Sequence, residues 1–423
     1  MQIKEKILSI LDRIWKNLWG FSKWVFVAIL VGIIVGSIGC IFYFSLNFVE
    51  DFRKSNPWML YLLPIDGLLI VFLYHLSHVV EPRGTNLILT AICCEETEPP
   101  ARMAPLIFIS TTLTHLFGGS AGREGAALQL GGSLGNFIGN ILQFDDKSKN
   151  IVIMCGMSAA FTAIFGTPIA ATIFAMELIS VGIMYYSALV PCAIASIVAY
   201  AIAGQLGIKP ESYNIISSPA YGFISIVQVL VLAVLCAGIS IVLCYSLQNA
   251  GKSYKKYFPN PYLRIFAGGI FVIGLTWIFQ THDYLGLGKN IIVQAIDYGM
   301  VRPEAFVLKI LFTAVTLGAG FKGGEIVPAF FVGATFGCAV GSLLGLPPSF
   351  AAAIGLIAVF CGVTNCPMTA LIMSFELFNF TSPLLFLIAT GVSYMLSGYY
   401  SLYSTQKIMY DKLKPQYINR KTH

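Results

Sequence analysis

Apolar segments of two lengths alternate along the chain, and this alternation limits the fold more than any other feature. The longer segments hold about 20 residues, the length that an α-helix needs to cross a bilayer. The shorter ones are bounded by glycine, proline or charge, which is typical of helices that end inside the membrane. Hydrophobic residues make up 57% of the chain, above the roughly 45–50% of soluble domains, so we expect an all-α polytopic membrane protein with discontinuous helices. The long segments include 24–49, 58–80, 221–248 and 262–280, and the short ones include 105–117, 167–183, 304–317 and 367–380.

A repeat relates the two halves of the chain. The segment TPIAATIFAMELI (167–179) matches CPMTALIMSFELF (366–378), at an offset of 199 residues. In membrane transporters, broken segments in corresponding positions of two halves point to a binding site at the repeat interface. We therefore predict a first repeat over 24–205 and a second over 221–404.

Each half also contains a glycine-rich loop, GGSAGREGAALQLGG (118–132) in the first and GAGFKGGEIVPAFFVGATFG (318–337) in the second. We expect helices to begin after these loops, near Ala126 and Ile326. A helix N-terminus presents unpaired N–H groups and about half a positive charge, and glycine lets the backbone approach an ion closely. Two such ends that converge predict an anion site. The repeat offset places Arg123 opposite Lys322 and Gly125 opposite Gly324.

Packing is the alternative for several of these residues. Glycines four residues apart commonly let two helices approach closely, and Arg123 and Lys322 are also compatible with a structural role at a helix end. Glu124 differs, because a carboxylate near the bilayer centre costs roughly 2.5–3.5 kcal/mol on insertion scales and marks a functional candidate. A carboxylate can occupy an anion site and leave it when protonated, which exchanges anions for protons. The glycines that we assign to packing are Gly131, Gly135, Gly139, Gly333, Gly337, Gly341 and Gly345.

The two ends of the chain are basic. Residues 1–23 lack the apolar core and cleavage site of a signal peptide and predict an amphipathic interfacial helix, and residues 405–423 form a short basic tail. By the positive-inside rule both termini are cytoplasmic, so the net charge of +6 reflects topology and we expect no nucleic-acid binding. The cysteines lack metal-site spacing, and no HExxH, GxSxG or acid dyad stands in a convincing context. We expect no metal, no cofactor and no enzymatic activity.

Five motifs carry a resemblance to a known family. GREGAALQLGG, GGEIVP, TPIAATIFAMEL, CPMTALIMSFEL and LYS (402–404) occur over nearly the whole chain and resemble motifs of the CLC family of chloride channels and chloride/proton antiporters. The resemblance implies a single CLC-type transmembrane domain over 1–404, built as an inverted repeat of tilted and discontinuous helices. It also implies a homodimer with one pore per subunit. Because the sequence stops at His423, we expect none of the cytoplasmic CBS domains that some members carry.

The resemblance implies roles for two residues. Glu124 falls on the family's gating glutamate. Tyr403 falls on the tyrosine whose hydroxyl faces the central anion. The alternative for Tyr403 is a position in the interfacial aromatic belt, but a buried phenol needs a partner and an anion can be one.

The departures from the family pattern are informative. The family's GGIFxP is GGEIVP here, and Leu178 stands where an internal proton glutamate is expected, directly after Glu177. Together these changes resemble the fluoride-exporting branch of the family. The family's GSGIP anion loop is replaced by RGTNLIL, so its counterpart is one of Gly84, Thr85 and Asn86.

What the resemblance implies is a fluoride/proton antiporter that exports fluoride across the cell membrane of a bacterium, with Glu124 as a protonatable gate. Fluoride is small and strongly hydrated, so its site must replace water with several close hydrogen bonds. The alternative is a chloride/proton antiporter or a passive halide channel on the same scaffold. The expected partners are fluoride or chloride, protons, the lipid bilayer and a second subunit. The residues expected to bind the anion are Tyr403, Gly324, Glu325, Ile326, Val327, Gly84, Thr85, Asn86, Arg123 and Gly125.

Three further acids and a histidine each have two possible roles. Glu325 either relays protons or caps its own helix N-terminus, where a carboxylate is favoured. Glu177 and Glu376 are expected to be structural hydrogen-bonding groups at a helix end or dimer contact, although acids inside a membrane also mark proton relays. His115 is expected to be a satisfied core histidine rather than a proton carrier.

Overall fold

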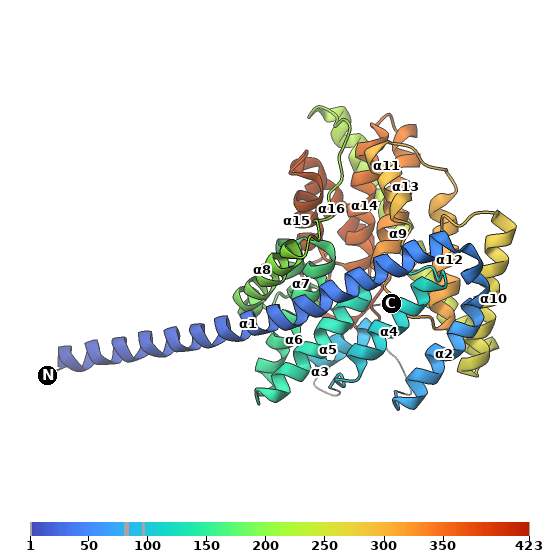
Figure 1. Cartoon of the computed structure of the whole chain (residues 1–423). Coiled ribbons are helices and arrows are strands. Elements are labelled where there is room, and N and C mark those ends of the chain that lie inside the picture. The colour runs from blue at the N-terminus through green and yellow to red at the C-terminus, as the bar shows by residue number, and fades with distance from the viewer. Residues whose placement is uncertain (1, 80–83, 95–97, 423) are drawn as a thin grey trace.

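The computed structural model describes residues 2–79, 84–94 and 98–422. Helices from both halves of the chain pack into one body, from which the start of α1 projects (Figure 1). The first-half elements are α1 (Gln2–Ser55), η1 (Pro57–Leu62), α2 (Leu63–Leu76), α3 (Thr85–Cys94), α4 (Met103–Leu116), α5 (Glu124–Ile141), α6 (Asp146–Phe165), α7 (Pro168–Glu177), η2 (Tyr186–Ala188) and α8 (Leu189–Gln205).

The predicted division into long and short helices is confirmed. Within the described residues, seven helices are long and apolar enough to cross a membrane. The predicted short segments form α4, α7, α12 and α15, with 10 to 15 residues each. The second-half helices are α9 (Phe223–Tyr257), α10 (Pro261–Phe279), α11 (Lys289–Asp297), α12 (Ala305–Ala319), α13 (Ile326–Leu343), α14 (Pro348–Thr364), α15 (Pro367–Phe378) and α16 (Pro383–Leu396).

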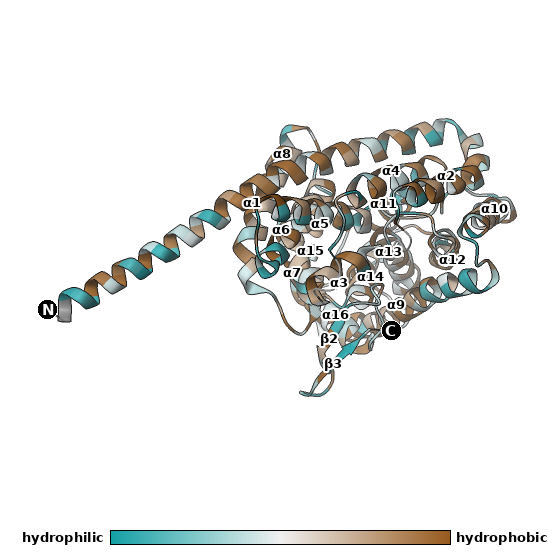
Figure 2. Cartoon of the chain, turned by 90° about the horizontal axis from the view of Figure 1, so that it is seen from below, coloured by the Kyte–Doolittle hydropathy of each residue, from teal (hydrophilic) through white to brown (hydrophobic). Residues whose placement is uncertain are grey.

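The predicted N-terminal helix is continuous with the first long apolar segment. α1 runs for 54 residues, so the boundary that we predicted after residue 23 is not a break. Gly20 is the only weak helix former near that boundary, and a single glycine costs a helix only about 1 kcal/mol relative to alanine. Residues 4–19 are exposed, and this part of α1 extends away from the other helices (Figure 2).

Two glutamates join the copies of the repeat by capping each other's helix. Glu177, at the end of α7, accepts hydrogen bonds from two backbone N–H groups in the first turn of α15, at 3.0 and 2.8 Å. Glu376 of α15 accepts two from the first turn of α7, also at 3.0 and 2.8 Å. A carboxylate at a helix N-terminus satisfies unpaired donors and interacts favourably with the helix dipole. The predicted hydrogen-bonding role of both acids at helix ends is confirmed.

Glycines bring pairs of helices into backbone contact. A Cβ atom at Gly131 of α5 would lie 2.2 Å from the carbonyl oxygen of Gly156 in α6. A Cβ atom at Gly333 of α13 would lie 2.4 Å from the carbonyl oxygen of Gly355 in α14. Both distances are far below van der Waals contact, so only glycine permits this approach. The predicted packing role of Gly131 and Gly333 is confirmed.

The C-terminal segment folds back as a small sheet that the all-α prediction did not include. Its strands are β1 (Ser180–Val181), β2 (Lys407–Tyr410) and β3 (Tyr417–Lys421), with β2 parallel to β1 and antiparallel to β3. The Gln406 amide nitrogen also donates to the carbonyls of Leu178 and Thr364, at 2.9 and 2.8 Å. Residues 405–422 are therefore attached to the helical body.

Gly131→Ala should destabilise the protein. The added methyl group forces α5 and α6 apart, and overpacking of this kind costs roughly 1–3 kcal/mol, so the midpoint of thermal unfolding in detergent should fall. Gly238→Ala in α9 is the matched control, because nothing lies within 4 Å of its Cβ position and alanine favours a helix. Equal stability of the two variants would contradict the close contact.

Candidate functional site

The two glycine loops meet in a short antiparallel bridge. The Gly122 N–H donates to the Gly324 carbonyl and the Gly324 N–H donates to the Gly122 carbonyl, both at 2.7 Å. α5 begins two residues after Gly122, at Glu124, and α13 begins two residues after Gly324, at Ile326. The N-termini of the two helices therefore converge, as predicted. The Gly324 N–H is used in the bridge and is not free for an anion.

The bridge corrects the predicted register between the loops. We predicted Gly125 opposite Gly324, but Gly122 is the residue paired with Gly324. Arg123 consequently corresponds to Glu325 rather than to Lys322. The reason is that α6 has 20 residues and its counterpart α14 has 17, so the offset of 199 that holds for α7 and α15 does not hold before these helices.

Glu124 is the first residue of α5 and is only 1% exposed. Its Oε2 atom accepts a hydrogen bond from the Arg123 backbone N–H at 3.1 Å, and its Oε1 atom lies 3.4 Å from the Arg123 Nε atom. The carboxylate thus lies at the positive end of a helix, where a free anion binds favourably.

Acidic side chains surround the Arg123 guanidinium. Arg123 Nη2 lies 2.9 Å from Glu211 Oε1, and Lys289 Nζ lies 2.7 Å from the same oxygen. The guanidinium also lies 4.9 Å from the centre of the Tyr43 ring. Because Glu124 and Glu211 already match its charge, this geometry favours the structural alternative for Arg123. Sequence reasoning missed Glu211, which lies 88 residues from Arg123 and carries no spacing signal.

The start of α13 faces the start of α5. Glu325 is the N-cap residue of α13, but its side chain makes no capping hydrogen bond. A Cβ atom at Gly125 would lie 3.2 Å from Glu325 Oε2, so the carboxylate points toward α5. Ile326 and Val327 are buried, and the first N–H groups of a helix have no partner within it. They are candidate anion donors.

Tyr403 approaches the same region from the end of the chain. It is 1% exposed, and among the described residues its hydroxyl has no hydrogen-bond partner. Glu325 and Glu124 are close enough to act electrostatically on this phenol. Its carbonyl accepts a hydrogen bond from the Thr422 hydroxyl at 2.6 Å, which fixes the backbone. A buried phenol of this kind can donate a hydrogen bond to an anion.

The segment that begins at Gly84 forms another wall of the site. Gly84 has a φ of +60°, which glycine adopts without strain. The Thr85 hydroxyl donates to the Gly125 carbonyl at 3.3 Å. The Asn86 Oδ1 atom instead accepts from the backbone N–H and the hydroxyl of Thr405, at 3.2 and 2.9 Å. Of the three predicted alternatives, Thr85 contacts the start of α5 and Asn86 ties the wall to the C-terminal segment.

A cavity of about 20 Å³ lies beside Glu124 and reaches Glu211 and Lys289, which is enough space for about one water molecule. The rings of Phe165 and Phe330 also line it and lie 5.5 Å apart. The cavity is thus narrow, and Glu124 lines it. A removable negative charge in this position can compete with an anion for the same helix end.

The chain is similar to known proteins over most of its length. A family profile described as "Voltage gated chloride channel" matches residues 66–398. The chain is 36% identical over 403 residues to the "Chloride/fluoride channel protein" of Pseudomonas syringae pv. tomato, covering 92% of this chain and 88% of that protein. It is 26% identical over 439 residues to the "H(+)/Cl(-) exchange transporter ClcA" of Vibrio campbellii, covering 93% of this chain and 91% of that protein.

A solved structure gives the same result. The crystal structure of a CLC-type fluoride/proton antiporter matches with a TM-score of 0.87 and 32% identity, over 91% of this chain and 98% of the other. The family profile and the relatives describe channels and transporters rather than enzymes. The chain is therefore a multi-pass membrane protein that belongs to the CLC family.

Proposed function

We propose that the protein exports fluoride across the cell membrane of a bacterium in exchange for protons, with Glu124 as the protonatable gate. The observation that carries this proposal is the Glu124 carboxylate at the start of α5, where an anion would bind. The printed names of the Pseudomonas relative and of the similar antiporter structure both include fluoride. These names support the fluoride branch of the family for this chain.

The proposal also covers the orientation of the chain in the membrane and its assembly into a homodimer. Both termini are cytoplasmic, and residues 1–404 form one transmembrane domain that pairs with a second copy, with one pore in each subunit. α1 then crosses the membrane once, so its end at Ser55 and the loop 280–288 lie outside the cell. We call this side the outer face.

Fluoride enters a site whose donors replace its hydration shell. The candidate donors are the N–H groups at the starts of α5 and α13, including those of Gly125, Ile326 and Val327, and the hydroxyls of Thr85 and Tyr403. Helix N-termini favour an anion electrostatically, and burial strengthens each hydrogen bond because water no longer competes.

Proton coupling follows from competition for the site. Charged Glu124 occupies the helix end and excludes fluoride. Protonation removes its charge, the carboxyl group leaves the helix end, and fluoride takes its place. The Glu124 carboxyl group therefore either carries a proton or occupies the helix end. Each exchange moves protons and fluoride in opposite directions.

A chloride/proton antiporter is the second candidate, because the chain is also similar to the Vibrio exchanger. Proteoliposomes loaded with fluoride or chloride separate the candidates when anion efflux and pH are recorded together. We expect faster fluoride efflux and proton movement in the opposite direction. Fluoride efflux no faster than chloride efflux, without proton movement, would overturn the fluoride proposal.

Glu124→Gln should remove proton coupling. The amide keeps the size of the side chain but cannot exchange a proton, so a fluoride gradient should no longer drive protons, which a pH electrode records directly. Glu304→Gln is the control, because Glu304 is an exposed acid away from the site. If Glu124→Gln kept normal coupling, Glu124 would not be the gate.

Tyr403→Phe should weaken fluoride binding. A hydrogen bond to a charged group is worth roughly 1.5–3 kcal/mol, so the dissociation constant should rise about 10- to 100-fold, as measured by titration calorimetry in detergent. Tyr410→Phe is the control, because the Tyr410 side chain is 46% exposed in β2. An unchanged affinity in Tyr403→Phe would assign the Tyr403 hydroxyl to another role.

A further inference from the structure

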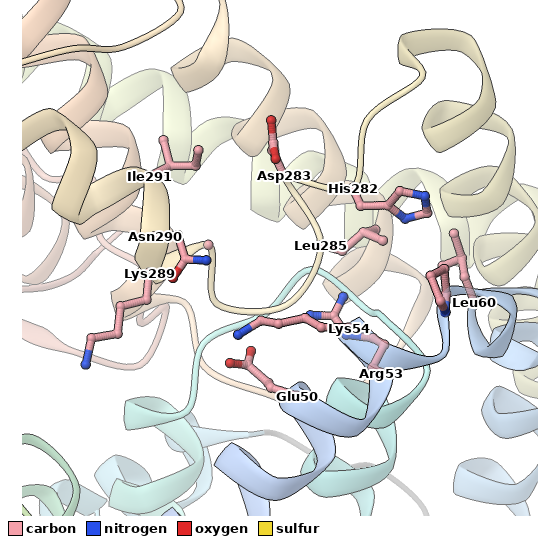
Figure 3. Close-up of a pocket in the computed structure, with 12 residues that line it drawn as sticks. Glu50, Arg53, Lys54, Leu60, His282, Asp283, Leu285, Lys289, Asn290 and Ile291 are labelled. Carbon is pink, nitrogen blue, oxygen red and sulfur yellow. The ribbon is translucent and has the colours of Figure 1, made fainter.

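A second group of ionisable residues lies at the end of α1, apart from Glu124. A cavity of about 290 Å³ opens there, between α1, the loop 280–288 and α11. Glu50 extends from α1 into this cavity, with Arg53 and Lys54 one turn further along the helix, and Asp283 lies on the facing loop (Figure 3). The Leu287 backbone N–H donates to Glu50 Oε1 at 3.1 Å. Glu50 therefore joins the cavity to the protein interior.

His115 lies behind Glu50 and is completely buried. Its Nδ1 atom is 3.5 Å from Glu50 Oε1, and its Nε2 atom is 3.3 Å from the Gly122 carbonyl oxygen. Both ring nitrogens thus lie near oxygen atoms that only accept hydrogen bonds, and at 3.5 Å Nδ1 makes no hydrogen bond within the described residues. A neutral imidazole has one N–H and an imidazolium has two, so only the protonated ring can donate to both.

The Gly122 carbonyl connects this histidine to the proposed gate. The same oxygen accepts the hydrogen bond from the Gly324 N–H that closes the bridge between the two loops. Glu124 follows Gly122 by two residues and begins α5. A change in the hydrogen bonding of this carbonyl therefore acts on the point where both helix ends are joined.

Charged side chains from several elements surround Glu50 and His115. Lys309 of α12 is fully buried and donates to the carbonyls of Tyr284 and Gly286, at 3.1 and 2.7 Å. The other charged or titratable groups facing the pair are Arg53, Lys54, Arg123, His282, Asp283 and Lys289.

We propose that Glu50 and His115 form a second proton site, reached from the outer face, which positions the loop that carries Glu124. At low external pH a proton from water in the cavity makes His115 an imidazolium, which donates to Glu50 and to Gly122. As pH rises, Nε2 loses its hydrogen, because the charge-assisted bond to the carboxylate keeps the one on Nδ1. A lone pair then faces the Gly122 carbonyl, and the junction loosens.

Nitrogen NMR of the detergent-solubilised chain tests the proton site without any transport assay. The protein has five histidines, and His115→Gln identifies the signal of His115. We expect two protonated ring nitrogens in the wild-type chain and one in Glu50→Gln at the same near-neutral pH, because the variant loses the neighbouring negative charge. Asp283→Asn, in the same cavity, is the control. A neutral His115 ring in the wild-type chain, or two protonated ring nitrogens in both proteins, would overturn the proposal.

Fluoride/proton exchange in proteoliposomes tests the positioning role, and this part rests on the proposed function. Glutamine at position 115 keeps a donor for Gly122 but binds no proton, so His115→Gln should exchange at the wild-type rate in acid and should not slow as the pH is raised, whereas the wild-type protein should slow. His115→Leu lacks the donor and should be about tenfold slower throughout.

The two proposals fail in different ways. A wild-type protein that exchanges no fluoride for protons contradicts the proposed function, and the NMR titration still decides whether the proton site exists. A wild-type protein that does exchange, with an identical pH profile in His115→Gln, contradicts the positioning role of His115.

Discussion

The paired hydrogen bonds between Gly122 and Gly324 are the interaction on which the rest of the structure depends. They hold two helix ends face to face, and each end brings unpaired donors that the bilayer cannot satisfy. Such ends are stable only where protein or an ion meets them. The unpaired N–H groups that make the junction costly in a membrane also make it a favourable place for an anion. Glu124 supplies a negative charge there from within the chain.

The surrounding contacts keep this junction in place. Gly131 and Gly333 bring the backbones of α5 and α13 against α6 and α14, while Glu177 and Glu376 satisfy the helix ends of α7 and α15. Each half contributes one such glycine contact and one such glutamate, so two similar sets of contacts hold the opposing helix ends in place. Carboxylates therefore have two uses under the proposed function: Glu177 and Glu376 stay bound to helix ends, whereas Glu124 leaves its helix end when protonated.

Much of this arrangement follows from local sequence. Segment length predicts the broken helices, and a buried acid between glycines identifies Glu124. Local patterns fail where the contact is distant: Glu211 meets Arg123 across 88 residues, and no periodicity marks that pair. The offset of 199 residues does not hold before α6, because α6 is three residues longer than its counterpart α14. Extra residues inside an apolar helix leave no recognisable pattern in the sequence. His115 was expected to be a satisfied core residue, but its Nδ1 atom makes no hydrogen bond within the described residues, which depends on the folded position of Glu50.

The sheet formed by β1, β2 and β3 has a consequence for the order in which the protein is completed. Tyr403 lies after both sets of helices, and the Thr422 hydroxyl that fixes its backbone comes later still. During synthesis, the glycine loops of both halves leave the ribosome before this wall exists. The candidate site thus acquires this wall only after both halves have been synthesised, so a chain that stops before Tyr403 lacks it.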